Sequence, residues 1–368
     1  MALKSVLIVT AGFGEGHNAA ARNLAEAVRL DCPQAHVEVH DVFLEAYGWA
    51  NRLIQKGYLL VINHAPWIWK AVFRWLDGSN AVGGGIGIFR RAARRLSALI
   101  AEMDPDVVVS TYPGYGHLLD HIYRGAAFRP FRKVTVVTDS LTINSVWHRC
   151  HSDFFLVPNQ ATADVMQKAG VPSAKIRVTG FPVPAVFAGP PPSRDCPPSD
   201  GQWRVLFMVN SAHHTAPDVV RELLGIEKIS LTVTVGRDAR LASRLEELAK
   251  SLGRPLEIHG WTPEIPNLIR RSHLLVSKAG GATVQESLAA RTPMVITQIV
   301  PGQEEGNARL LIESGAGELA TTPTAIAEAV RKTFANGAAL YHSRFDATLP
   351  LSHPRSSAEA ARFLASLA

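Results

Sequence analysis

The residue near the N-terminus best suited to chemistry is a histidine at the end of a glycine-rich stretch, "TAGFGEGHNAA" (Thr10–Ala20). A dinucleotide-binding turn reads G-x-G-x-x-G, and here Gly12 and Gly14 fit while His17 stands at the third glycine position. An imidazole would occupy the space in which helix and strand must pack closely, so a dinucleotide site is disfavoured. A histidine that starts a helix after the carboxyl end of a strand can instead act as a base. The alternative is a capping histidine without chemistry.

A second stretch, "SKAGGATVQESLAARTPMVITQIVPGQEEGNARLLIESGAG", combines an anion site with polar side chains. Gly280 and Gly281 form a turn that opens a predicted helix, where free backbone N–H groups and the helix dipole favour a pyrophosphate. Glu286, farther along that helix, is placed to accept hydrogen bonds from ribose hydroxyls. Gln303 and Glu304 follow the next predicted strand, and their amide and carboxylate groups suit sugar hydroxyls. The two features in this order predict a nucleotide-sugar site.

Three further charged residues stand near predicted strand ends. Asp139 follows the apolar run "KVTVVT", and a pairing with His17 would hold the imidazole tautomer and raise its basicity. A capping aspartate is the alternative. Lys278 and Arg237 could neutralise a leaving phosphate, although Arg237 is equally well explained as a solvated residue at a helix start.

Two patterns resemble metal sites without supporting one. Asp104-Pro105-Asp106 precedes the run "DVVVS", at its amino end, whereas ligands of open parallel sheets bind at carboxyl ends. The motif "HRCH" (148–151) has no second pair of ligands at zinc spacing. We therefore expect no bound metal.

Short β-branched runs alternate with amphipathic helical patterns along all 368 residues. The runs are apolar on both faces, which is typical of parallel sheets covered by helices on both sides. The segment "GPPPSRDCPPSDG" (189–201) holds five prolines and reads as an interdomain linker. The sequence therefore predicts two α/β domains of similar size that face each other across a cleft.

The charge is unevenly distributed. Residues 1–185 hold 19 Lys and Arg against 14 Asp and Glu, a balance of +5, whereas residues 186–368 hold 19 against 18, a balance of +1. The basic residues lack the aromatic spacing of an RNA-binding sheet, so we expect no nucleic acid and favour an anionic membrane surface. No run of 18 apolar residues is present, and three scattered cysteines favour a reducing, cytoplasmic setting.

An aromatic segment and an arginine-rich helix would make that membrane contact. Residues 47–89 resemble an interfacial segment, in which aromatic rings lie at headgroup level, and the arginines that follow fall on one side of a helix. The alternatives are core tryptophans and a solvated helix face. The residues expected at the membrane are Trp67, Trp69, Trp75, Arg90, Arg91, Arg94 and Arg95.

The motifs "KAGGATVQESLAARTPMVI" and "PGQEEGNA" resemble the donor site of GT-B glycosyltransferases related to monogalactosyldiacylglycerol synthase, processive diacylglycerol glucosyltransferase and MurG. "TAGFGEGHNAAA" resembles the acceptor-side turn of the diacylglycerol enzymes, and "VVTDSLTINSVWH", "DFFLVPN" and "KIRVTGFPV" also resemble that group. The resemblance spans almost the whole chain in the right order. It implies a GT-B fold of two Rossmann-like parallel-sheet domains, with a UDP-sugar as co-substrate and no cofactor.

The resemblance also implies site roles. The backbone around Trp261 and Thr262 would face the uracil, and Gly280, Gly281 and Thr283 would hold the pyrophosphate. Glu286 would bind the ribose, and Gln303 and Glu304 the donor sugar. His17 would deprotonate the acceptor hydroxyl, beside the backbone room that Gly14 and Gly16 provide.

One stretch departs from the family pattern. The family has a glycine-rich turn after the first strand of the second domain, whereas here "RVLFMV" runs into "NSAHHTAPD". Asn210 and Ser211 still offer hydrogen bonds there.

We therefore expect an inverting transfer of a hexose from a UDP-sugar to a lipid hydroxyl, as in diacylglycerol, peripherally on the inner face of the cell membrane. A GT-B nucleotide-sugar epimerase and a non-catalytic lipid- or nucleotide-binding relative are the alternatives. The expected divisions are an N-terminal acceptor- and membrane-facing domain (1–188), the linker (189–201), a nucleotide-sugar-binding domain (202–350), and a C-terminal helix (351–368) that could pack back on the N-terminal domain.

Overall fold

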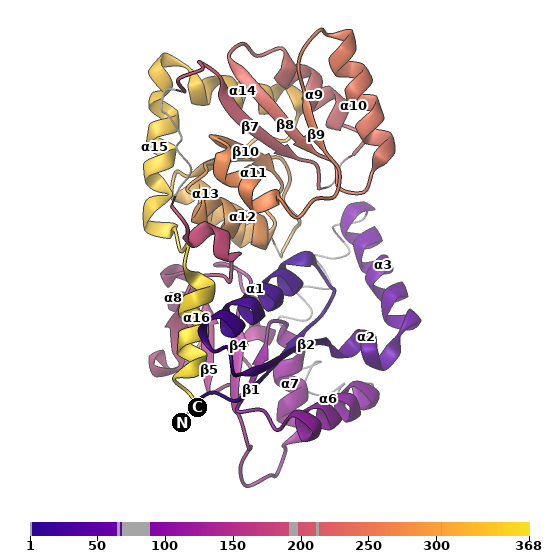
Figure 1. The fold of residues 1–368 in the computed structure, drawn as a ribbon, viewed down its shortest axis with the longest axis vertical. Coiled ribbons are helices and arrows are strands. Elements are labelled where there is room, and N and C mark those ends of the chain that lie inside the picture. Colours follow the sequence, from indigo (N-terminus) through magenta and orange to yellow (C-terminus); the bar gives the residue numbers. More distant parts are fainter. Residues whose placement is uncertain (1, 65–66, 68–88, 191–197, 211–212, 303) are drawn as a thin grey trace. The chain divides into compact units, whose positions relative to one another are not determined.

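The computed structural model describes residues 2–64, 67, 89–190, 198–210, 213–302 and 304–368. These residues form two compact units, each built around one parallel sheet (Figure 1). Unit 1 comprises Met1–Ala185, Val300–Gly306 and Arg355–Ala368, and unit 2 comprises Val186–Ile299 and Asn307–Pro354. Most of the proline-rich segment lies outside the described residues.

Unit 1 holds a six-stranded sheet in the order β2-β1-β3-β4-β5-β6, with every strand parallel to its neighbours. Its strands are β1 (Ser5–Thr10), β2 (His36–Asp41), β3 (Val107–Ser110), β4 (Arg132–Val136), β5 (Phe154–Val157) and β6 (Ile176–Val178). Its helices are α1 (Glu15–Asp31), α2 (Val42–Tyr47), α3 (Trp49–His64), α6 (Arg90–Met103), α7 (Pro113–Ile122), α8 (Gln160–Lys168) and α16 (Ser356–Ala365).

The alternation of side chains along β1 explains the layers of unit 1. Val6 and Ile8 pack with Leu24 of α1 and Leu364 of α16, whereas Leu7 and its neighbours on the opposite face pack against α6 and α7. Figure 1 shows α16, in yellow, beside α1, in indigo. Because both faces of the sheet are covered, the central strands β1 and β3 are buried along their whole length, whereas the edge strand β2 carries polar, half-buried residues.

Unit 2 repeats this plan with the strand order β12-β11-β10-β7-β8-β9. Its strands are β7 (Trp203–Met208), β8 (Ile229–Thr234), β9 (Glu257–His259), β10 (Leu274–Ser277), β11 (Met294–Ile296) and β12 (Gly317–Leu319). Its helices are α9 (Ala216–Leu224), α10 (Ala239–Ser251), α11 (Ile265–Arg271), α12 (Gly281–Ala289), α14 (Pro323–Phe334) and α15 (Ala339–Ala347), and α13 (Glu305–Glu313) begins in unit 1 and continues in unit 2. One face of this sheet packs against α9, α10 and α14.

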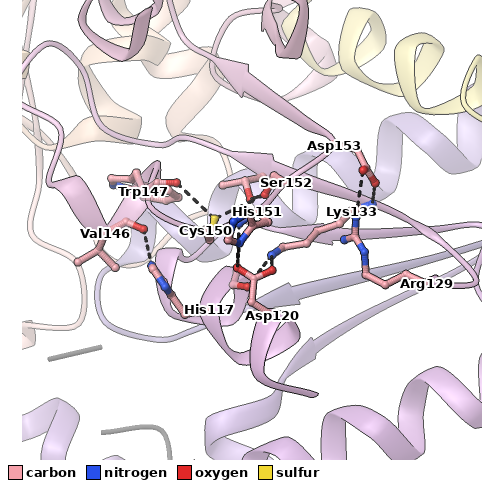
Figure 2. A network of polar contacts seen from close by, with 12 residues as sticks. His117, Asp120, Arg129, Lys133, Val146, Trp147, Cys150, His151, Ser152 and Asp153 are labelled. Atoms are coloured by element: carbon pink, nitrogen blue, oxygen red, sulfur yellow. Dashed lines mark hydrogen bonds and ion pairs between the residues drawn. The ribbon is translucent and has the colours of Figure 1, made fainter. Parts of the chain in front are cut away.

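A buried lysine fixes the segment that follows β4. The Lys133 side chain is fully buried, and its Nζ donates to the Gly116 carbonyl oxygen at 2.6 Å and to Asp120 Oδ1 at 2.7 Å. Figure 2 shows that Asp120 also accepts the backbone N–H of His151, at 2.8 Å. The network connects β4 and α7 to the turn after Trp147, so the backbone of that turn is fixed by hydrogen bonds.

Replacing this lysine tests how strongly the network stabilises unit 1. Lys133→Met leaves the Gly116 carbonyl and the Asp120 carboxylate without their cation, and we expect the free energy of unfolding to fall by about 3 kcal/mol. Urea unfolding measures the loss, with Lys168→Met, at an exposed position of α8, as control. Equal stability of the two variants would contradict a structural role for the buried ion pair.

Candidate functional site

The chain order places His17 at the point where the topology of the first sheet reverses. From β1 the chain goes to β2 on one side and returns to β3 on the other, so β1 and β3 are neighbours whose connections diverge. Ligands of open parallel sheets bind outside the carboxyl ends of the strands at such a point. His17 lies in the first turn of α1, which follows β1, and Thr111 directly follows β3. His17 Nδ1 lies 2.9 Å from the Thr111 carbonyl oxygen, which joins the two strand ends.

The surroundings of His17 fix the tautomer of its imidazole. A carbonyl oxygen only accepts, so Nδ1 carries the proton and donates it to Thr111, with Thr138 Oγ1 also 2.9 Å away. The ring meets Tyr112 edge-on and lies 6.0 Å from the ring of Trp147. Across the described residues, no partner is found for Nε2, which therefore keeps its lone pair. Burial lowers the pKa of His17 to about 4, and the hydrogen bond to the Thr111 carbonyl, which raises the pKa, offsets only part of this effect. The ring is therefore neutral at pH 7.

The expected pairing of Asp139 with His17 is wrong in this structure. The Asp139 carboxylate accepts the indole N–H of Trp147 at 2.8 Å, and the Nδ1 position of His17 is taken by Thr111 and Thr138. Withdrawal from water raises the pKa of Asp139 to about 6, with a smaller contribution from the nearby Glu304 carboxylate. Asp139 thus contacts Trp147, whose carbonyl oxygen accepts from Cys150 Sγ in the network of Figure 2.

The glycine turn before His17 is anchored by a protein carboxylate. The Gly12 N–H donates to Asp41 Oδ2 at 2.9 Å, and Asp41 Oδ1 caps α2 by accepting from the Leu44 N–H. Gly14 precedes α1 and has a φ of 127°, a backbone conformation that residues other than glycine rarely adopt. Gly16 lies in the first turn of α1. The turn thus shapes backbone next to the imidazole, and its first N–H is already bound to Asp41.

The segment that contains Glu304 belongs to unit 1, although its sequence neighbours on both sides belong to unit 2. The side chain is buried, and its Oε2 accepts the Val300 N–H at 2.9 Å. A β-carbon on Gly306 would clash with the carbonyl oxygen of Ser140, so the two backbones are in direct contact. Glu304 is therefore placed beside Asp139, within the same unit as His17. Gln303 lies outside the described residues.

In unit 2 the topology reverses between β7 and β10, and the predicted donor residues follow these strands and their neighbours. Asn210, two residues after β7, donates from Nδ2 to Ser277 Oγ at the end of β10, at 2.9 Å. Gly280 is the N-cap of α12 and has no side chain to satisfy the first N–H groups of the helix. These features bring the predicted anion-binding turn to the carboxyl edge of the sheet at its switch point.

The other predicted donor residues of unit 2 lie at the same edge. Arg237 follows β8, and its guanidinium lies 5.8 Å from the ring of Trp261, which follows β9 and is 67% exposed. Thr262 Oγ1 accepts the Glu264 N–H. Lys278, Thr283 and Glu286 are half-buried on the β10–α12 connection and in α12. Ser211 lies outside the described residues.

The expected membrane surface is described in part. Arg90, Arg91 and Arg94 of α6 are exposed, and the Trp67 side chain is 72% exposed. Arg95 is a correction to the predicted stripe, because it is half-buried and its Nε donates to Glu45 Oε2 at 2.7 Å. Trp69 and Trp75 lie outside the described residues.

Other described residues add exposed apolar surface and remove one metal candidate. Trp49, Leu53 and Ile54 of α3 are more than half exposed.

Asp106 accepts the N–H groups of Lys4 and Ser5 through Oδ2, which gives it a structural role at the amino end of the sheet. Within the described ranges there is no group of three potential metal ligands, and no helix long and apolar enough to cross a bilayer.

Sequence reasoning missed the residues that hold His17. Thr111 and Thr138 each follow a strand and carry no motif, and Trp147 lies in a short 3₁₀ turn (Ser145–Trp147). The available signal was positional. Polar residues directly after buried strands collect at the carboxyl edge of a parallel sheet, but the strand order that brings two of them together must be known first.

Each unit contains a segment that matches a family model. Residues 17–183 match the family model for monogalactosyldiacylglycerol (MGDG) synthase, and residues 212–349 match that for the glycosyltransferase family 28 C-terminal domain. Monogalactosyldiacylglycerol synthase 2 of Arabidopsis thaliana is 25% identical, over 90% of this chain and 74% of the relative. The processive diacylglycerol beta-glucosyltransferase of Bacillus subtilis (strain 168) is 24% identical, over 93% of this chain and 90% of the relative.

Solved structures show the same fold at lower identity. MurG of Acinetobacter baumannii aligns with a TM-score of 0.61 and 14% identity, over 98% of this chain and 99% of MurG. The S. aureus MnaA–UDP co-structure aligns with a TM-score of 0.61 and 12% identity, over 96% of this chain and 94% of MnaA. These similarities confirm the predicted GT-B fold.

The lowered pKa of His17 predicts a pH-dependent stability. The unfolded chain binds a proton at this site below about pH 6.5 and the folded chain only near pH 4, so the free energy of unfolding falls as the pH is lowered between these values. The loss reaches about 3 kcal/mol, and His17→Gln should remove it. Asp139, whose raised pKa acts in the opposite sense, is present in both proteins and cancels in the difference. Urea unfolding between about pH 7.5 and 4.5 tests this. Parallel pH profiles for the two proteins would contradict a buried neutral His17.

Proposed function

We propose that this chain, a GT-B glycosyltransferase of the group related to MGDG synthase, transfers a hexose from a UDP-sugar to the hydroxyl of a diacylglycerol-like lipid. The observation that carries the proposal is the neutral His17, whose Nε2 has a lone pair and no partner among the described residues. It stands at the switch point of unit 1, in the segment that matches the MGDG synthase model. The curated relatives named above are lipid glycosyltransferases, which favours a lipid acceptor.

The proposed reaction is a single displacement with inversion. The acceptor oxygen attacks the anomeric carbon, and the bond from that carbon to the β-phosphate oxygen breaks, so UDP leaves with the electron pair. His17 Nε2 takes the acceptor proton, and the Thr111 carbonyl supports the imidazolium through Nδ1–H. An α-linked donor thus yields a β-glycoside. Burial keeps Nε2 unprotonated at neutral pH, so the base is ready before the acceptor binds.

The donor is assigned to unit 2. The first N–H groups of α12, from Gly281 to Thr283, would bind the pyrophosphate, with Lys278 balancing its charge. Glu286 would accept from the ribose hydroxyls, and Asn210 would replace the missing glycine turn by hydrogen bonding to a phosphate.

Further contacts complete the donor and membrane assignments. Trp261 and Thr262 would border the uracil, with Arg237 stacked on the indole. Gln303 and Glu304 are proposed to bind the donor sugar. On the membrane side, the exposed arginines of α6 and the aromatic side chains near Trp67 would attach the protein to anionic lipid at the cytoplasmic face.

A nucleotide-sugar epimerase is the second candidate, because one observation favours it. Epimerisation needs acidic side chains, and Asp139 and Glu304 lie close enough to interact, with the pKa of Asp139 raised to about 6. Several similar solved structures are UDP-N-acetylglucosamine 2-epimerases. An epimerase would convert its UDP-sugar without any lipid, whereas a transferase would need the lipid for turnover.

Removal of the base should stop transfer without affecting the donor. His17→Ala is expected to lower kcat at least 100-fold, which is typical for loss of a general base, with UDP affinity unchanged. Glycolipid formation from UDP-hexose and diacylglycerol vesicles measures the first effect and calorimetry the second. His121→Ala, at an exposed position of α7, is the control. Wild-type rates in His17→Ala would remove this residue from the mechanism.

The donor assignment is tested by binding alone. We expect UDP to stabilise the protein in a thermal shift, with ADP, GDP and NAD ineffective. Glu286→Ala should weaken UDP binding roughly tenfold or more, since a hydrogen bond to a charged group contributes about 1.5–3 kcal/mol. Glu328→Ala, an exposed residue of α14, should bind UDP normally. Unchanged binding by Glu286→Ala would place the ribose elsewhere.

A further inference from the structure

Two buried amide groups on α3 have no hydrogen-bond partner for their nitrogen atoms within the described part of the chain. They are Asn51 Nδ2 and Gln55 Nε2. The two residues are one helical turn apart and so lie on the same side of α3, and Asn51 is only 3% exposed. A buried N–H group without an acceptor destabilises the folded protein, so two such groups side by side call for an explanation.

The position of Gln55 links this pair to the glycine turn. A β-carbon on Gly12 would lie only 2.6 Å from Gln55 Nε2, so the amide rests directly on the Gly12 backbone. The Gly12 N–H donates to Asp41 Oδ2, and Gln55 Nε2 has no acceptor among the described residues. Gly12 and His17 both follow the carboxyl end of β1, and Nε2 of His17 has no partner in the described part of the chain. Gln55 therefore contacts the turn that leads to the proposed base, and Asn51 lies one helical turn away from Gln55.

The chemistry of the acceptor matches what these amides lack. A diacylglycerol has one hydroxyl group, which the proposed function assigns to His17. Its other polar atoms are ester oxygens, and the two carbonyl oxygens accept hydrogen bonds but never donate them. Two buried NH₂ groups, of Asn51 and Gln55, are donors without acceptors. A ligand with only hydrocarbon atoms would leave both NH₂ groups without an acceptor. A ligand group that only donates hydrogen bonds could not satisfy them either.

We propose that Asn51 and Gln55 bind the ester carbonyl groups of the lipid acceptor and so select an acylated glycerol. This inference rests on the proposed function and assigns its acceptor-recognition residues. The two amides position the acceptor, so that its hydroxyl meets His17 Nε2. They take no part in proton transfer. The two unsatisfied N–H groups destabilise the free protein, and hydrogen bonds to the lipid carbonyl groups would remove this cost when the lipid is bound.

The test combines near-isosteric variants with a change in the lipid. Asn51→Leu and Gln55→Met keep the side-chain volume and remove the N–H groups. The acceptors are dioleoylglycerol and its dialkyl ether analogue, which lacks the carbonyl oxygens, both in phosphatidylcholine vesicles with a UDP-hexose. For the wild type we expect the ether to raise the acceptor KM at least tenfold, because the buried donors lose their acceptors. The variants should show a similarly raised KM with either lipid.

Three readouts separate positioning from a structural role. The donor KM and the slow hydrolysis of the UDP-hexose by water should not change in the variants. Their Tm should equal or exceed that of the wild type, since removing an unsatisfied buried donor does not destabilise. Gln167→Leu, which removes an exposed amide on α8, should match the wild type for both lipids. A variant that still discriminates ester from ether as the wild type does, or a clear fall in Tm, would overturn the inference.

The outcome is distinguishable from failure of the proposed function. Calorimetric binding of the short-chain dioctanoylglycerol and its ether analogue applies the same comparison without turnover. If the wild type binds the ester tightly but transfers no sugar, the proposed transfer fails while the amide contacts stand. If the wild type transfers sugar and the variants keep its acceptor KM, the transfer stands and the amide contacts fail. If the wild type binds neither lipid, both are wrong.

Discussion

The hydrogen bond from His17 Nδ1 to the Thr111 carbonyl determines what the first unit can do. It joins the ends of β1 and β3 at the point where the sheet topology reverses, and it fixes which nitrogen of the imidazole is left with a lone pair. The ring is neutral because burial lowers the pKa of His17 to about 4, and within the described part of the chain its Nδ1 contacts a carbonyl and a hydroxyl oxygen. The backbone carbonyl of Thr111 therefore sets the tautomer of the proposed base, while the Asp139 carboxylate accepts the indole N–H of Trp147.

The same topological rule governs the second unit. Asn210 and Ser277 meet between β7 and β10, as His17 and Thr111 meet between β1 and β3. In one unit the switch point carries a histidine, and in the other it carries a helix start whose N-cap, Gly280, has no side chain. Under the proposed function, the same architecture would supply a base at one switch point and an anion site at the other, so function would follow from the residues placed at each edge.

The sequence was informative wherever local pattern dictates structure. Buried β-branched runs predicted the parallel strands, and the Gly280–Gly281 turn predicted the start of α12, because both depend on neighbouring residues alone. The pairing of Asp139 was mispredicted because the direction of a side chain at a strand end depends on a residue, Trp147, that follows an irregular turn. The exposure of Arg95 was mispredicted because its guanidinium donates a hydrogen bond to Glu45, which lies on another helix. Such long-range partners leave no periodic signal.

Transfer of a sugar to a lipid hydroxyl with inversion is the proposed activity of this chain. The most direct test is to incubate the purified protein with diacylglycerol vesicles and UDP-glucose or UDP-galactose and to determine the anomeric configuration of any product by NMR. We expect a β-linked glycolipid, formed in equal amount with UDP and only when lipid is present. An epimerised or hydrolysed sugar formed at the same rate without lipid, or an α-linked product, would contradict it.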